Sequence, residues 1–217
     1  MIKSKNFTYI HPLKCGGTFV NEILLDVVDS KSLGYHLPRS RAMYEHNFVT
    51  SVRNPFDWYV SFYYHSLRYR GYFVKASGDF KSTLIDLLDL KTSSKYAELL
   101  SHDWVADTDP MFTTKDFDDY SDDIGFYSWY WNRMSANKDG NTDDVHVMRV
   151  ENLREDLVET IGKFGGISQY QKDVILNAPK ARVEEKRTDY HDYYDEELVA
   201  LVYKKDKAIF DRFGYEF

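Results

Sequence analysis

The chain has 217 residues and a mass of 25.6 kDa, which suits one sizeable domain with its own core. Hydrophobic residues make up 43% and charged residues 29%, a balance typical of globular chains and not of disordered or fibrous ones. The formal charge of −7 argues against nucleic acid as the main partner, but it leaves room for a local basic pocket that binds an anionic ligand.

The single cysteine, Cys15, cannot form an internal disulfide, and no stretch is apolar and long enough to enter a membrane. These features predict a cytoplasmic protein without membrane insertion. The histidines and the cysteine show no spacing typical of metal ligands, so we expect no metal.

The first pattern in the chain is a strand, a glycine turn and a helix. Residues 6–10 form a run that is β-branched or aromatic after Asn6, as in a strand, and one helix face is predicted by Val20, Ile23, Leu24, Val27 and Val28. Between them lies the sequence His11-Pro12-Leu13-Lys14-Cys15-Gly16-Gly17-Thr18. Such a turn leaves the first N–H groups of the helix unpaired at the positive end of its dipole, so it predicts an anion site.

The next segments lead to a second strand. Residues 29–32 are expected to form a loop, residues 33–38 a short extended piece, and residues 39–45 a short helix. Residues 47–52 are apolar on both alternations, which is typical of a buried parallel strand, and they place Arg53 at its C-terminal end.

A helix is predicted directly after this strand. Asn54 suits the N-cap, Pro55 the first helical position, and Asp57 the first turn, where the helix dipole favours a carboxylate. The helix should continue to about Arg68, and it carries Ser61 two turns from its start.

The middle of the chain, residues 71–135, predicts a mostly helical insertion. Its apolar spacing indicates helices around residues 84–90, 96–100 and 124–134. The acidic stretch 103–123 is interpreted as a solvated lid or loop in preference to a site for a cationic acceptor.

The last third of the chain repeats the strand-and-helix pattern. Residues 145–150 predict a third strand, residues 152–164 a helix closed by Gly165 and Gly166, and residues from about 194 to 213 a final helix. Strands that alternate with helices predict a three-layer α/β fold in which helices flank a central parallel sheet.

These motifs resemble those of the sulfotransferases that use 3′-phosphoadenosine 5′-phosphosulfate (PAPS). Residues 11–18 are similar to the family's 5′-phosphosulfate loop, and residues 52–61 resemble its 3′-phosphate motif. Residues 148–153 and 193–217 resemble two further family segments, so the resemblance covers both ends of the chain well and the middle poorly. It implies a fold like that of P-loop NTPases, with PAPS as the cofactor.

The resemblance also implies roles for individual residues. It assigns the 5′ end of PAPS to Lys14, Cys15, Gly16, Gly17 and Thr18, and the 3′-phosphate to Arg53 and Ser61. The two sets match the two anionic ends of PAPS, and both follow predicted parallel strands, where open α/β sheets bind ligands. A late basic cluster, Lys180, Arg182, Lys186 and Arg187, resembles the segment that closes over the 3′-phosphate and adenine, with a solvated loop as the alternative.

For catalysis, Lys14 is the candidate that stabilises charge on the leaving phosphate oxygen. His36 is the first candidate for the base that deprotonates the acceptor, because several family members place a histidine or an acid in this extended segment. It could instead be a structural histidine, in which case Glu45 and His65 are the next candidates.

The acceptor expected from the resemblance is a carbohydrate or lipid-linked glycan, with a small hydroxylated metabolite as the alternative. Two other classes of protein use a similar turn. A P-loop kinase would need magnesium and a lysine after the second glycine, whereas Lys14 precedes both glycines. A catalytically silent nucleotide-binding protein would keep both phosphate sites without the base.

Overall fold

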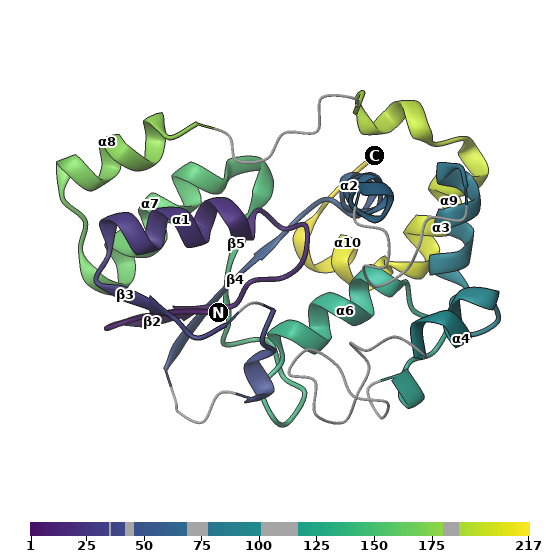
Figure 1. Ribbon diagram of the computed structural model, residues 1–217, viewed down its shortest axis with the longest axis horizontal. Helices are drawn as coiled ribbons and strands as arrows, with labels where there is room; N and C mark the ends of the chain where they lie inside the picture. Colours follow the sequence, from purple (N-terminus) through teal and green to yellow (C-terminus); the bar gives the residue numbers. More distant parts are fainter. Residues whose placement is uncertain (35, 42–45, 69–77, 101–116, 180–186) are drawn as a thin grey trace. The chain divides into compact units, whose positions relative to one another are not determined.

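The computed structural model describes residues 1–34, 36–41, 46–68, 78–100, 117–179 and 187–217 (Figure 1). The chain forms two compact units. The first comprises Met1–Arg53 and Trp131–Val183, and the second comprises Asn54–Tyr130 and Glu184–Phe217. The expected single domain stays a prediction.

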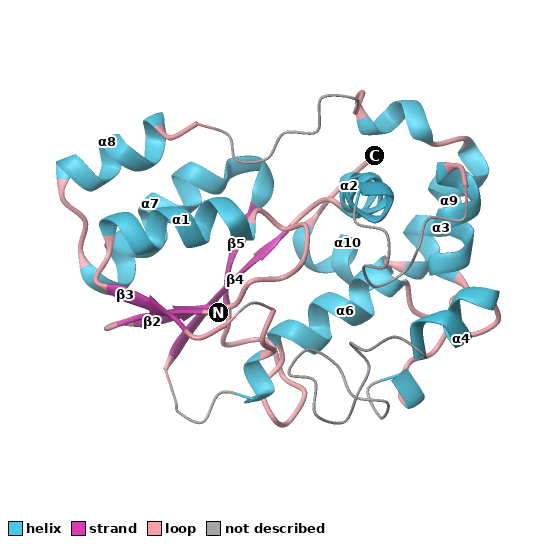
Figure 2. Ribbon diagram, viewed as in Figure 1, coloured by secondary structure: helices cyan, strands magenta, loops and turns pink. Residues whose placement is uncertain are grey.

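The first unit is built on a five-stranded sheet in the order β3-β1-β2-β4-β5 (Figure 2). The strands are β1 (Ile2–Ser4), β2 (Phe7–Tyr9), β3 (Ser30–Ser32), β4 (Asn47–Val52) and β5 (His146–Arg149). The three strands expected from the sequence, β2, β4 and β5, run parallel, with Tyr9 opposite Val49 and Val52 opposite Arg149. Their C-terminal ends therefore lie at the same edge of the sheet.

The sheet as a whole is mixed, so the predicted central parallel sheet is confirmed for β2, β4 and β5 but does not extend to β1 and β3. β1 pairs antiparallel with both β2 and β3. A tight turn joins β1 to β2, and Ser4 Oγ accepts a hydrogen bond from the Phe7 N–H at 3.1 Å. A connection this short gives an antiparallel pair, because parallel neighbours need a long crossover. The prediction of a loop at residues 29–32 was also wrong, because the exposed edge strand β3 forms there.

Three helices cover one face of this sheet: α1 (Gly17–Val27), α7 (Leu153–Gly165) and α8 (Gln169–Asn177) (Figure 1). The core between helices and sheet includes Tyr9, Val20, Leu24, Val49, Met148, Leu157 and Ile161. The other face carries the end of α6 (Phe126–Ser135), where Trp131 Nε1 donates to Ser51 O at 3.0 Å. The predicted helices at α1 and α7 are confirmed, whereas α8 was not predicted from the sequence.

The regular secondary structure of the second unit is helical throughout the residues that the structure describes. It contains α2 (Pro55–Arg68), α3 (Phe80–Leu88), α4 (Ser94–Leu100), α9 (Glu196–Lys205) and α10 (Lys207–Phe213). The start of α2 is confirmed, since Asn54 Oδ1 accepts from the Phe56 N–H at 3.0 Å. The described part of residues 71–135 is mostly helical as predicted, and its role as an insertion stays a prediction. Within the described ranges, no helix combines the length and apolar composition needed to cross a bilayer.

The predicted final helix is two helices, because the chain breaks at Asp206 between α9 and α10. The Asp206 carboxylate is fully buried and accepts from Tyr59 OH at 2.7 Å and from the Ser128 N–H at 2.8 Å. Gly125 makes room for it, because a Cβ there would lie 2.4 Å from the carboxyl carbon of Asp206. The hydrogen bonds of Asp206 therefore connect three separate segments of the second unit.

Burial raises the pKa of Asp206 to about 6, and the hydrogen bonds from Ser128 and Tyr59 oppose that rise. A carboxyl whose pKa is higher in the folded than in the unfolded state loses stabilising free energy as pH rises through that window. We expect this group to lower the free energy of unfolding by about 2 kcal/mol between about pH 4 and about pH 6.

The measurement is urea denaturation of the unaltered protein and of Asp206→Asn across this pH range. The difference between the two free energies of unfolding should change by that amount, because the amide does not titrate. A difference that is constant with pH would contradict the raised pKa.

Candidate functional site

The turn between β2 and α1 has a left-handed backbone at two positions. Lys14 has φ 62° and Gly16 has φ 74°, and Gly16 is the N-cap of α1 without a side-chain cap hydrogen bond. A glycine adopts this conformation freely, whereas for a lysine it costs about 1 kcal/mol or more. The strain at Lys14 is therefore maintained by its surroundings.

Hydrogen bonds from β4 and the residue after it hold this turn. Arg53 Nη1 donates to Lys14 O at 3.1 Å, and Ser51 Oγ donates to Cys15 O at 2.6 Å. Ser51 in turn accepts from Tyr9 OH at 2.8 Å. The N–H and C=O of one peptide unit point in opposite directions, so the bond to Cys15 O turns the next N–H, that of Gly16, away from Ser51.

The N–H groups of Gly16, Gly17 and Thr18 lie where the turn enters helix α1. No acceptor among the described residues takes a hydrogen bond from the backbone N–H of Gly16, Gly17 or Thr18. They lie at the positive end of α1, where helix termini bind anions. Lys14, which is half-buried, adds a full positive charge to the same turn.

The glycines of the turn also allow close packing. A Cβ on Gly17 would lie 1.8 Å from Cδ2 and 2.1 Å from Nε2 of His11, so the imidazole rests directly against the backbone. A Cβ on Gly16 would lie 2.5 Å from Leu153 Cδ2, at the start of α7. Both positions therefore exclude any larger residue unless the neighbouring side chain moves.

His36 lies next to this turn. Its Nδ1 donates to His11 O at 3.1 Å, and the two imidazole rings are 4.6 Å apart. Burial lowers the pKa of His36 to about 4, and the positive charge of Lys14 contributes to that lowering. At neutral pH the ring is therefore uncharged, with its proton on Nδ1 and its lone pair on Nε2.

The backbone of His36 is strained as well, with φ 51°. In the part of the chain that the structure describes, Lys14 and His36 are the two residues other than glycine with positive φ. Conformations of this kind cost free energy and cluster at functional sites. The two candidates for catalysis thus occupy the two strained positions, in one unit.

Two further candidates lie in the second unit. Ser61 is on α2 with 9% of its surface exposed, one helical turn beyond Asp57. Arg187 forms an ion pair with Asp57, and both side chains are largely buried. The structure therefore brings Arg187 to the helix that carries Ser61.

Several predicted residues fall outside the described ranges: Glu45, Lys180, Arg182 and Lys186. His65 is described and lies on α2. Across the described ranges, no group of three or more histidine, cysteine, aspartate and glutamate side chains is arranged to hold a metal ion. The expected absence of a metal stays a prediction.

Sequence reasoning missed three residues that build the site: Tyr9, Ser51 and Asn21. Tyr9 OH donates to Ser51 Oγ, which in turn donates to Cys15 O in the turn, and Asn21 on α1 contacts His11. A serine in a buried apolar strand was the available signal for Ser51, because a buried hydroxyl needs a hydrogen-bond partner.

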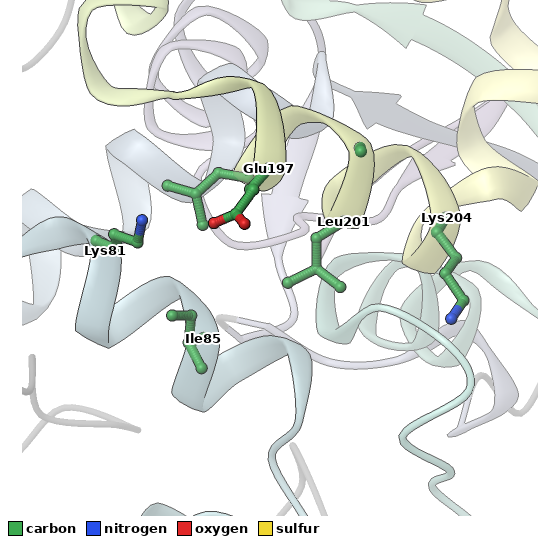
Figure 3. Close-up of a pocket in the computed structure, with 7 residues that line it drawn as sticks. Lys81, Ile85, Glu197, Leu201 and Lys204 are labelled. Atoms are coloured by element: carbon green, nitrogen blue, oxygen red, sulfur yellow. The ribbon is translucent and has the colours of Figure 1, made fainter.

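A groove of about 460 Å³ lies in the second unit between α3 and α9 (Figure 3). Ile85 of α3 and Leu201 of α9 project toward it, and Lys81 and Glu197 also line it. None of the site residues predicted from the sequence lines this groove.

No protein-family model matches the chain, and no curated protein matches it either. The assignment of a function therefore depends on the chemistry of the residues described above.

Proposed function

We propose that the protein is a sulfotransferase that transfers the sulfuryl group of PAPS to a hydroxyl or amine of an acceptor. The observation that carries this proposal is the pair of hydrogen bonds from Arg53 and Ser51 to carbonyls of the turn before α1. They leave the N–H groups of the turn for an anion, as a 5′-phosphosulfate requires. We also propose a fold like that of P-loop NTPases, because the turn follows a strand that is parallel to its neighbour β4.

The residues of this chain divide the binding of PAPS between its two ends. The turn, with Lys14 and Thr18, would hold the 5′ end, which supplies the activated sulfuryl group. The resemblance of residues 52–61 to a 3′-phosphate motif assigns Arg53 and Ser61 to the 3′-phosphate, and a guanidinium and a hydroxyl can both donate to phosphate oxygens. Arg187 is the described member of the late basic cluster that would close over the same end.

Two side chains would act during transfer. The ammonium of Lys14 stabilises negative charge as it develops on the leaving phosphate oxygen, a task for which a compact charge is suited. Nε2 of His36 accepts the proton of the acceptor, because the bond from Nδ1 to His11 O fixes the tautomer. The lowered pKa keeps that nitrogen unprotonated at neutral pH.

The proposed acceptor is a carbohydrate or lipid-linked glycan, and a small hydroxylated metabolite is the second candidate. Incubation of the protein with PAPS and an acceptor library identifies the acceptor, with mass spectrometry to detect which molecule gains a sulfuryl group.

His36→Ala is expected to remove this transfer and to leave nucleotide binding intact. Transfer that survives in this variant would place the base elsewhere, with Glu45 and His65 as the next candidates.

Binding of the product nucleotide, 3′,5′-adenosine bisphosphate (PAP), tests the cofactor directly. PAP is expected to raise the midpoint of thermal unfolding, and ATP with magnesium is not. Arg53→Ala should weaken PAP binding by about tenfold or more, because a charged hydrogen bond to phosphate is lost. Lys31→Ala, at an exposed position of β3, is the control and should bind PAP normally. Stabilisation by ATP with magnesium but not by PAP would favour a kinase and contradict the proposal.

A further inference from the structure

His11 lies against both His36 and Gly17 in the first unit. Its side chain is buried, and the centroid of its ring lies 6.3 Å from that of Tyr9 and 4.6 Å from that of His36. The Cδ2 and Nε2 edge of the ring rests against Gly17 in the turn. His11 therefore touches both the candidate base and the backbone of the candidate anion site.

Asn21 fixes the protonation of this ring. Its Nδ2 lies 3.0 Å from His11 Nδ1, and an amide nitrogen only donates, so Nδ1 accepts and the ring proton is on Nε2. Adding a second proton at Nδ1 would break this bond. Asn21 thus holds His11 in its uncharged form.

The contact has a cost to the fold. Asn21 Oδ1 is buried, and no described residue donates a hydrogen bond to it. A buried acceptor without a partner lowers stability, so an apolar side chain of similar size would suit packing alone better. The hydrogen bond from the Asn21 side chain to His11 is therefore the evident contribution of this residue.

We propose that Asn21 and His11 are positioning residues for His36, so this inference rests on the proposed function and on His36 as its base. The carbonyl of His11 accepts a hydrogen bond from the Nδ1–H of His36, so the lone pair of the uncharged ring is on Nε2. The uncharged ring of His11 then allows His36 to become positively charged beside it during transfer. A charged imidazolium at the same place would oppose that step by repulsion between like charges.

The kinetic test uses Asn21→Leu, which keeps the approximate shape and removes the donor. We expect kcat for sulfuryl transfer to fall by about tenfold, with the KM for PAPS within about twofold of the unaltered protein, because the anion site is retained. Glu22→Gln, at the exposed neighbouring position of α1, is the matched control and should change neither constant. The expected result is thus an equal loss in kcat and in kcat/KM. A raised KM with unchanged kcat, or no change in either constant, would overturn the proposal.

Imidazole ¹⁵N chemical shifts test the positioning itself, without any turnover. In the unaltered protein we expect the proton of His11 on Nε2 and that of His36 on Nδ1. Asn21→Leu should alter the shifts of both rings, and Asn21→Asp, whose carboxylate accepts, should move the His11 proton to Nδ1. A proton on Nδ1 of His11 in the unaltered protein, or shifts that ignore both substitutions, would overturn the assignment. If the unaltered protein neither binds PAP nor transfers a sulfuryl group, the proposed function is rejected. The spectra test the positioning of His11 and His36 independently of that outcome, so the two proposals can fail separately.

Discussion

Gly17→Ala is expected to lower the free energy of unfolding by about 3 kcal/mol or more and to abolish PAP binding, because overpacking of a buried contact forces the backbone to move. The added Cβ would lie 1.8 Å from Cδ2 of His11, whose ring is buried beside those of Tyr9 and His36. Since the ring has little space to retreat, the turn must shift instead. That shift would disturb the N–H groups that are proposed to bind the 5′ end of PAPS.

A double-mutant cycle with His11→Ala separates this clash from other effects of the alanine. The same Gly17→Ala change should cost much less stability when His11 is already truncated, and the difference is measured by urea denaturation. Gly162→Ala in α7 is the matched control, because the nearest atom to its Cβ is Ile167 Cγ2 at an ordinary 3.5 Å. It should raise stability by about 1 kcal/mol through helix propensity. An equal loss in both His11 backgrounds would show that the clash is not the cause.

Elements with strong local signals were predictable from the sequence. The capped start at Asn54 and Pro55 places α2 correctly, and the apolar run at residues 47–52 coincides with β4. In both cases the determining physics is contained in a few consecutive residues: a cap, a ring that fixes φ, or a short strand that is buried on both faces.

The elements that were missed depend on distant partners. β3 is polar and exposed, and its strand conformation comes from backbone pairing with β1, which no side-chain pattern announces. The break at Asp206 falls within a run of helix-compatible residues, and it is explained by hydrogen bonds to Tyr59 and Ser128 elsewhere in the chain. Tertiary contacts override local propensity at both places.

The candidate site shows the same division. The turn at Lys14 to Thr18 and its neighbour Arg53 could be predicted, because glycines and basic residues directly follow strands. The hydroxyl of Ser51 and the amide of Asn21 could not, since their roles arise from contacts across the fold. The left-handed backbone of Lys14 and His36 is likewise invisible in a sequence, because neither residue type favours it.

The left-handed backbone at Lys14 is expected to lower the stability of the fold, and the Lys14 side chain is expected to be necessary for transfer. Lys14→Ala and Lys14→Gly should both lower sulfuryl transfer by about 10²–10³-fold, because each removes the charge that stabilises the leaving group. Their stabilities should differ. At φ 62° the glycine variant should be more stable than the alanine variant by about 1 kcal/mol, which reverses the order found at ordinary helical positions.

Transfer from PAPS and urea denaturation, measured on the same two variants, test both halves of this expectation, and Lys31→Ala on β3 controls for the loss of one positive charge. If the alanine variant were the more stable one, the left-handed backbone at Lys14 would be wrong. If both variants kept full transfer, another group would stabilise the leaving phosphate. A glycine variant that is more stable than the alanine variant, with both far less active than the unaltered protein, is the result expected from backbone strain retained for function.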